Sequence, residues 1–176
     1  LKMSKSPELG VCYYPEHWPE EMWITDAKNM SKNGIKWVRI AEFAWSRIEP
    51  SSGVFDWNWL DKIVDILGNN GLKIVMCTPT ATPPKWLVDQ MPEMVAIDEN
   101  GQARKFGSRR HYSFSHIGYQ KESQRITKAI AERYGQNNFV QARQTDNEFG
   151  CHETTYSWCL STLREFRIWL EKKYQN

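Results

Sequence analysis

The chain has 176 residues, of which 40% are hydrophobic and 25% are charged, as in an ordinary soluble globular protein with one sizeable core. Its 23 basic and 21 acidic residues leave a formal net charge of +2, which gives no electrostatic reason to expect nucleic acid or an anionic membrane as a partner. No apolar run approaches the ~18 residues that a membrane-spanning helix needs.

The chain opens with an apolar run and then a helical pattern. Residues 9–14 predict a short buried strand, and a helix is expected over 20–32. Pro19 stands near the start of this helix, where its missing N–H costs nothing, and Asn33-Gly34 is typical of a left-handed cap at its end.

The order of strand and helix is then repeated, and a third strand follows. A second strand is expected over 35–43, and a helix over 55–70 because apolar residues recur there at helical spacing. Asn70-Gly71 ends that helix as the first one ended. Residues 72–80 form a third, almost wholly apolar run, which is typical of a strand covered on both faces.

The second half of the chain begins with a long irregular segment. This segment covers 81–118, with a short helix expected at 84–90, and segments of this length in a compact domain are commonly functional. A strong helix over 119–134, a fourth strand over 139–149 and a last helix over 155–173 follow.

Alternating strands and helices predict a parallel sheet with right-handed crossovers, and both a doubly wound sheet and a barrel satisfy this order. A glycine-rich nucleotide-binding turn after the first strand would favour the doubly wound form. The sequence has Tyr14-Pro15-Glu16-His17-Trp18 at that place instead.

Polar and aromatic side chains follow each expected strand. In parallel α/β folds the carboxyl ends of the strands meet at one rim, where ligands bind. The nine Trp, seven Tyr and seven Phe exceed what a core of this size must hold, so some should line a concave surface. Such a rim suits a polyhydroxylated ligand, and its members are Glu16, His17, Trp18, Glu42, Phe43, Trp45, Thr78, Thr80, Arg109, Arg110, His111, Asp146, Asn147 and Glu148.

A pair of carboxylates is the usual equipment for hydrolysing a glycosidic bond, one as acid and base and the other as nucleophile. Asn147-Glu148, at the end of the fourth expected strand, offers the first of these. Glu148 could protonate the leaving oxygen while Asn147 holds a sugar hydroxyl.

At this point the sequence resembles the N-terminal part of the glycoside hydrolase family 42 β-galactosidases. The matching stretches are GVCYYPEHWPE (10–20), RIAEFAWSRIEP (39–50), FDW (55–57), PTATPPKWL (79–87), FGSRRHY (106–112), AERYG (131–135) and DNEFGCH (146–152). The resemblance implies a retaining (β/α)8 TIM barrel that removes terminal β-linked galactose, with Glu148 as general acid/base. It also implies that Asn147 and Arg109 bind the substrate and that the full-length form is a homotrimer.

The chain departs from the family in length. A (β/α)8 barrel takes ~250 residues in eight units, and only about the first four βα units are expected here. The family nucleophile is a Glu at the end of strand seven, for which this chain has no counterpart. Residues 1–176 are therefore interpreted as the N-terminal portion of a single truncated catalytic domain, and the isolated fragment is expected to be inactive.

A second departure concerns metal. Some family members hold a zinc ion with four cysteines, and at those positions this chain has Ser113, Ser157, Cys159 and Thr162. One thiolate does not make a closed tetrahedral site, so no zinc and no other cofactor is expected. Cys12 and Cys77 lie in apolar runs and are expected to be buried.

Several other polar residues have structural interpretations. Arg143 is an unexpected charge within the fourth strand, and Asp146 or another acid of the rim is the suggested partner for it. Asp146 itself is expected to hold a turn, and Glu16 and Glu42 to pair with nearby arginines. Trp45 and Trp18 could each stack on a sugar, but both are expected in the core.

Two alternatives remain open from the sequence. One is another retaining barrel glycosidase of the glucosidase or xylanase type, and the other is a non-catalytic sugar-binding remnant. The N-terminus lacks the apolar region of a signal peptide, so a cytoplasmic location is expected.

Overall fold

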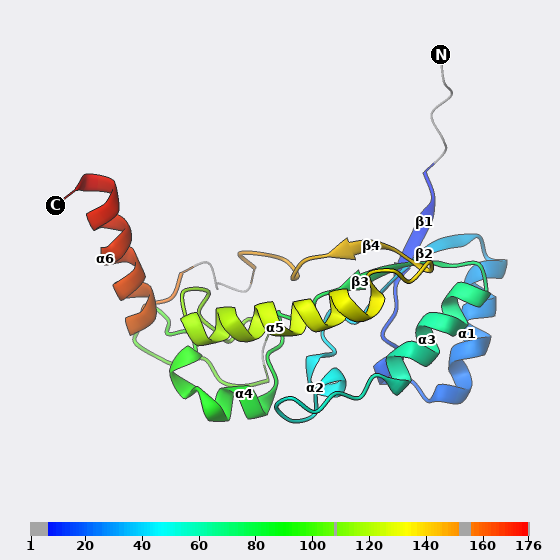
Figure 1. Ribbon diagram of the computed structural model, residues 1–176, viewed down its shortest axis with the longest axis horizontal. Coiled ribbons are helices and arrows are strands. Elements are labelled where there is room, and N and C mark those ends of the chain that lie inside the picture. Colours follow the sequence, from blue (N-terminus) through cyan, green and yellow to red (C-terminus); the bar gives the residue numbers. More distant parts are fainter. Residues whose placement is uncertain (1–6, 108, 152–155, 176) are drawn as a thin grey trace, which may run out of the picture.

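The fold is a parallel four-stranded sheet with helices packed on one face. The computed structural model describes residues 7–107, 109–151 and 156–175. Its strands are β1 (Leu9–Cys12), β2 (Ile35–Ile40), β3 (Lys73–Cys77) and β4 (Val140–Gln144), which lie side by side in chain order (Figure 1). A doubly wound sheet reverses its strand order, whereas a barrel keeps it, so the sheet has the topology of successive barrel strands.

The helices match the expected pattern with one addition. Helix α2, a single turn directly after β2, was not predicted, because four residues carry too little periodicity to be recognised. The last helix begins later than expected, and the expected start at residue 155 lies outside the described residues. The helices are α1 (Glu20–Lys32), α2 (Trp45–Ile48), α3 (Asn58–Asn69), α4 (Lys85–Gln90), α5 (Ile117–Tyr134) and α6 (Leu160–Tyr174), with 3-10 turns at Pro15–His17 and Pro92–Met94.

The expected helix caps are present. Asn33 and Asn70 follow α1 and α3, and each donates its side-chain amide to a carbonyl four residues earlier, at 2.8 Å in both cases. Gly34 and Gly71 then take positive φ angles of 83° and 78°, which cost a glycine little. Each strand is shorter than predicted, because the polar residues at its carboxyl end already belong to a turn.

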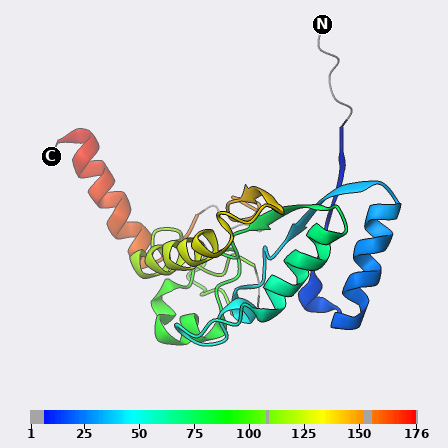
Figure 2. The same ribbon diagram turned by 45° about the vertical axis from the view of Figure 1, so that its right-hand side comes forward.

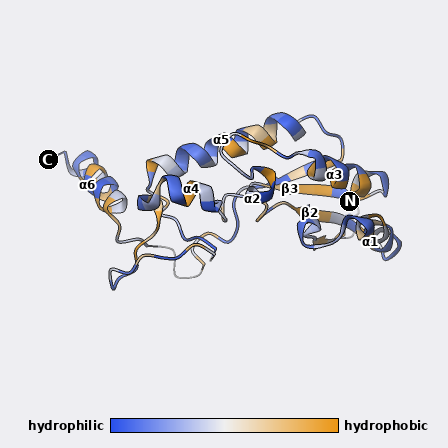
Figure 3. Cartoon of the chain, turned by 90° about the horizontal axis from the view of Figure 1, so that it is seen from below, coloured by the Kyte–Doolittle hydropathy of each residue, from blue (hydrophilic) through white to orange (hydrophobic). Residues whose placement is uncertain are grey.

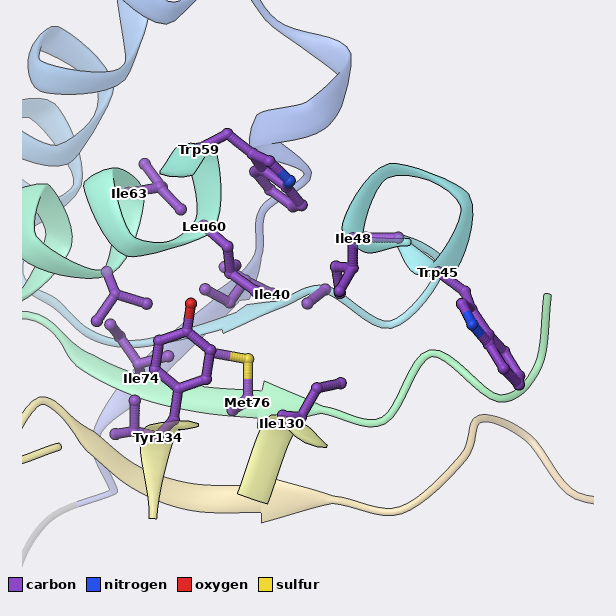
Figure 4. Close-up of a cluster of buried hydrophobic side chains, with 14 of the residues drawn as sticks. Ile40, Trp45, Ile48, Trp59, Leu60, Ile63, Ile74, Met76, Ile130 and Tyr134 are labelled. Carbon is purple, nitrogen blue, oxygen red and sulfur yellow. The ribbon is translucent and has the colours of Figure 1, made fainter. Parts of the chain in front are cut away.

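The hydrophobic core lies between the sheet and the helices. Ile40, Ile74 and Met76 point from β2 and β3 toward Leu60 and Ile63 of α3, and all five are at most 1% exposed (Figure 4). Tyr134 and Ile130 of α5 close the same cluster on the β4 side. Full burial of each such side chain contributes about 1.5–3 kcal/mol, so the helical stripe predicted for α3 is what fixes this helix to the sheet.

A glycine permits the close approach of α3 to the segment before β4. The ring of Phe139 fills the place that a side chain at Gly68 would take, and an added Cβ would lie 2.1 Å from its Cγ. A larger residue at Gly68 would therefore push α3 away from β4.

The other face of the sheet is open and partly polar. Trp37 and Lys73 lie on this face, and Glu8 accepts hydrogen bonds from the indole of Trp37 at 2.6 Å and from the Lys73 ammonium at 2.7 Å. All four residues of β1 are exposed, so the prediction that Cys12 is buried is wrong, whereas Cys77 is buried. Cys12 is exposed because β1 is an edge strand that no helix covers.

Helix α6 lies apart from the sheet, at the end of the molecule opposite α1 (Figures 1 and 2). None of its described residues is buried. The hydropathy colouring shows hydrophobic as well as hydrophilic residues along α6 (Figure 3). The large exposed hydrophobic residues of α6 are Leu160, Leu163, Phe166, Trp169 and Tyr174. Among the described helices, none is long and apolar enough to span a membrane.

The unexpected charge in β4 pairs with backbone carbonyls. The Arg143 guanidinium donates to the carbonyls of Tyr134 at 2.8 Å and of Val140 and Ala142 at 3.2 Å. The suggested pairing with Asp146 is wrong. Arg143 instead places its charge beside a carbonyl at the C-terminal end of α5, where the helix dipole favours a cation.

Candidate active site

The turn after β4 carries the predicted catalytic residues. Asp146 and Glu148 have positive φ angles of 56° and 47°, an uncommon conformation for residues with a side chain. Two hydrogen bonds hold the turn. The backbone amide of Asp146 donates to Thr78 Oγ1 at 2.7 Å, and the side-chain amide of Gln144 donates to the backbone carbonyl of Asp146 at 2.8 Å. Backbone strain of this kind gathers at functional sites, where the surrounding structure maintains it.

A buried ion pair lies beneath this turn. Arg110 is 1% exposed, and its guanidinium lies 3.4 Å from Asp146 Oδ1. The Tyr112 hydroxyl donates to the other oxygen of Asp146 at 3.4 Å, and the backbone amide of Asn147 donates to Oδ1 at 2.5 Å. The Asp146 carboxylate is thus committed to holding the turn, as the sequence predicted.

The neighbouring arginine has a different position. Arg109 Nη1 lies 3.3 Å from Glu148 Oε2, and the two side chains are 42% and 50% exposed. The guanidinium of Arg109 also lies 5.2 Å above the ring of Phe43, which follows β2. The structure therefore brings the predicted acid/base and the predicted substrate-binding arginine together at the surface of the rim.

Asn147 lies between these two pairs. It is 7% exposed, and its side-chain oxygen is 3.5 Å from the amide nitrogen of Gln144. This contact holds the side-chain amide of Asn147 at the carboxyl end of β4, one residue before Glu148.

A hydrogen-bonded chain links the ends of β1, β2 and β4 on the open face. Tyr14 donates its hydroxyl to Glu42, and Arg39 lies 2.7 Å from the second oxygen of Glu42. Arg39 also donates to the Gln144 side chain at 2.8 Å, and Gln144 contacts Asn147. Burial and the contact with Glu42 raise the pKa of Tyr14 to about 12, so its hydroxyl remains a donor at neutral pH.

Sequence reasoning assigned no role to Arg39 or Gln144 in supporting the catalytic turn. Their positions at the carboxyl ends of neighbouring strands were visible, but which face each side chain takes depends on strand register. The expected pairing of Glu42 with a nearby arginine is confirmed by its contact with Arg39.

Glu16 also lies at the rim but does not form the expected side-chain pair. The Arg47 guanidinium donates to its backbone carbonyl at 2.9 Å, and both carboxylate oxygens are buried with no hydrogen-bond partner among the described residues. Burial raises the pKa of the Glu16 carboxyl.

The four positions at which some family members hold zinc lie together here as a hydroxyl and thiol cluster. Ser113 Oγ lies 3.1 Å and Cys159 Sγ lies 3.4 Å from the Thr162 hydroxyl, and the Cys159 amide donates to Ser157 Oγ at 3.4 Å. Burial acts to raise the pKa of the Cys159 thiol, but hydrogen bonds from Ser113, Ser157 and Thr162 outweigh it and lower this pKa to about 7. No group of three metal-binding side chains occurs in the part of the chain that the structure describes.

The aromatic residues of the rim divide into two kinds. Trp45 is fully buried and donates its indole N–H to Glu49 at 2.9 Å, so it belongs to the core, as expected. Trp18 is 50% exposed, so the expectation that it packs in the core is wrong. Trp18 and Phe43, whose ring lies beneath Arg109, are accessible from the rim.

These features define a class of protein. Parallel strands in sequential order, helices on one face and polar side chains at the carboxyl end of the fourth strand are those of successive units of a (β/α)8 barrel.

A family model described as Glyco_hydro_42, β-galactosidase, matches residues 12–176. The chain is 52% identical over 166 residues to a β-galactosidase of Thermus thermophilus, and the match covers 94% of this chain and 26% of that protein. The chain belongs to the glycoside hydrolase family 42 β-galactosidases.

Solved structures agree with this assignment. The crystal structure of a β-galactosidase from the psychrophilic Marinomonas ef1 matches with a TM-score of 0.94 and 53% identity, over 96% of this chain and 26% of that one. A β-galactosidase from the Antarctic haloarchaeon Halorubrum lacusprofundi matches with a TM-score of 0.93 and 48% identity, over 97% and 25%. The chain thus spans about a quarter of the length of these relatives.

Proposed function

We propose that a protein carrying this chain hydrolyses terminal non-reducing β-D-galactose residues in β-galactosides, with retention of configuration. The observation that supports this most is the position of Glu148, which follows Asn147 at the end of β4 and lies 3.3 Å from Arg109 in a member of this family. In this proposal residues 1–176 are the N-terminal portion of one catalytic barrel domain.

Glu148 is the general acid and then the general base. Its carboxyl proton goes to the glycosidic oxygen while a second carboxylate attacks the anomeric carbon, so the bond to the leaving group breaks and a galactosyl–enzyme bond forms. Glu148 then takes a proton from water, whose oxygen replaces the enzyme carboxylate at the anomeric carbon. The two carboxyl groups would lie ~5–5.5 Å apart.

The second carboxylate is proposed to lie on a later strand of the barrel. Asp146 is poorly suited to attack, because it is buried and committed to Arg110 and to the Asn147 amide. Glu42 is 1% exposed and is held by Arg39 and Tyr14. We therefore propose that the nucleophile lies outside these 176 residues and that the chain alone does not turn over.

Asn147 and Arg109 are proposed to bind the substrate. Asn147 offers an amide that can hold the sugar 2-hydroxyl, and its neighbour Gln144 keeps the amide at the rim. Arg109 offers a guanidinium that is half-exposed and directed by Phe43 toward Glu148, where it can bind a sugar oxygen and the attacking carboxylate. The proposed activity needs no cofactor.

The proposal extends to assembly and location. The full-length form is proposed to be a cytoplasmic homotrimer. Light scattering coupled to size-exclusion chromatography of the full-length protein tests the assembly, and a monomer mass would contradict it.

A chimera tests the activity. Residues of this chain replace the matching 166 residues of the Thermus thermophilus β-galactosidase, which supplies the rest of a barrel. We expect the chimera to hydrolyse lactose and nitrophenyl β-galactoside, and to act far more slowly on the glucoside and xyloside. Preference for the glucoside or xyloside would contradict the proposed substrate, and turnover by the 176-residue chain alone would contradict the external nucleophile.

A further inference from the structure

A cavity whose lining includes neither Arg109 nor Glu148 lies between a hairpin and the segment that leads into α6. Its volume is about 620 Å³, within the range of small-molecule sites. One wall carries Asp98, Glu99, Asn100, Gln102, Ala103 and Arg104, and the other carries Tyr156 and Trp158.

The two walls are joined to each other by hydrogen bonds. The hairpin closes through a bridge between Ile97 and Ala103, and Asp98 Oδ1 accepts from the backbone amides of Asn100 at 2.9 Å and Gln102 at 2.8 Å. The backbone amide of Trp158 donates to the Ile97 carbonyl at 2.8 Å. Ile97 of the hairpin thus ties one wall to Trp158 of the other wall. The cavity is therefore formed before a ligand binds, which lowers the entropic cost of binding.

The aromatic wall is open to solvent. Tyr156 is 79% exposed and Trp158 is 67% exposed, although rings of this size bury ~150–250 Å² each when covered. Large exposed rings beside a cavity are typical of ligand sites. A ligand that covers such a ring removes apolar surface from water, which favours binding.

The chemistry of the two walls matches a saccharide. Flat indole and phenol rings suit the C–H face of a pyranose, and the carboxylates and amides opposite them can accept and donate hydrogen bonds to its hydroxyls. The carboxylates of Asp98 and Glu99 outnumber the single cation, Arg104, so the charge of the lining disfavours a phosphorylated or other anionic ligand.

We propose that this cavity is a second saccharide-binding site, which holds a galactoside at a place distinct from the Arg109–Glu148 pair. The choice of a galactoside rests on the proposed function. The cavity does not carry out the reaction and binds a second sugar molecule beside the catalytic barrel.

Fluorine NMR of the 176-residue chain labelled with 5-fluorotryptophan tests the site, with lactose as the probe. We expect lactose to shift the Trp158 resonance. Trp158→Ala, which has no such resonance, is examined by calorimetric titration and is expected to bind lactose about tenfold or more weakly. Trp169→Ala is the matched control, because Trp169 is 49% exposed on α6 outside the cavity. Arg109→Ala should leave the Trp158 shift in place.

No shift of the Trp158 resonance at saturating lactose overturns the proposal. Loss of the shift in Arg109→Ala also overturns it, because the sugar would then be bound at the catalytic rim. Circular dichroism of each variant confirms that the fold is retained, and Tyr156→Ala gives a second test if Trp158→Ala does not fold. A chimera inactive on galactosides, together with lactose binding that depends on Trp158, would refute the proposed function and leave the second site standing.

Discussion

Mutations in the two neighbouring ion pairs of the rim should lower the free energy of unfolding by very different amounts. Asp146→Ala leaves the Arg110 guanidinium, which is 1% exposed, without its carboxylate. Removing one partner of a buried ion pair costs about 3–5 kcal/mol, because the remaining charge stays desolvated. Glu148 and Arg109 are about half-exposed, so solvent screens this pair, and Glu148→Gln should cost at most about 1 kcal/mol.

Urea unfolding followed by circular dichroism measures both effects on the 176-residue chain. Asp146→Asn keeps the shape and is expected to lose about 1–3 kcal/mol, so it remains measurable if Asp146→Ala does not fold. The reasoning is refuted if both Asp146 variants unfold within about 0.5 kcal/mol of the wild type while Glu148→Gln is the more damaging change. That outcome would reverse the division between a structural pair and an accessible one.

Three further changes probe the cluster near α6 and the core. The pKa of the Cys159 thiol is about 7 in the folded chain and about 8.5 in the unfolded chain. Its thiolate therefore stabilises the folded state fully above the unfolded pKa, and this stabilisation is lost as pH falls through 7. The unfolding free energy should therefore rise by about 1 kcal/mol from pH 7 to 8.5, and Cys159→Ser should remove that rise; equal slopes would contradict this. Replacing Ser113, Ser157 and Thr162 by Cys should create a site that binds one zinc ion, measured by elemental analysis and by a higher melting temperature; the unmodified chain should bind none, and a triple variant free of zinc would contradict the cluster geometry. The carboxylate of Glu49 is fully buried and accepts hydrogen bonds at 2.7–2.9 Å from the Trp45 indole, the Arg125 guanidinium and the Gly53 backbone amide. Glu49→Gln should therefore cost about 3 kcal/mol in urea unfolding, and a cost under about 1 kcal/mol would contradict this role.

The sequence predicted the elements that depend on local pattern. The apolar stripe of α3 and the Asn-Gly caps of α1 and α3 follow from residues within a few positions of one another. The place of Glu148 followed from counting strands, since the carboxyl ends of parallel strands share one rim.

Features that depend on distant contacts were not predictable. Arg143 pairs with carbonyls of its own strand and of α5, and the exposure of Cys12 depends on β1 being an edge strand. The link from Arg39 to Gln144 spans 105 positions, and only the register of the sheet shows that the two side chains face each other. The cavity beside Trp158 likewise joins segments about 60 residues apart.

The most direct test of the central claim is Glu148→Gln in the Thermus thermophilus chimera. We expect kcat/KM for lactose to fall by about 10²–10⁴, because the leaving oxygen needs a proton, while the first step with a nitrophenyl galactoside falls much less. Azide, which needs no general base, should restore turnover of the nitrophenyl substrate and give a β-galactosyl azide. Glu132→Gln, an exposed change on α5, is the matched control and should keep full activity. Normal hydrolysis of lactose by Glu148→Gln would contradict the assignment of Glu148 as the acid/base.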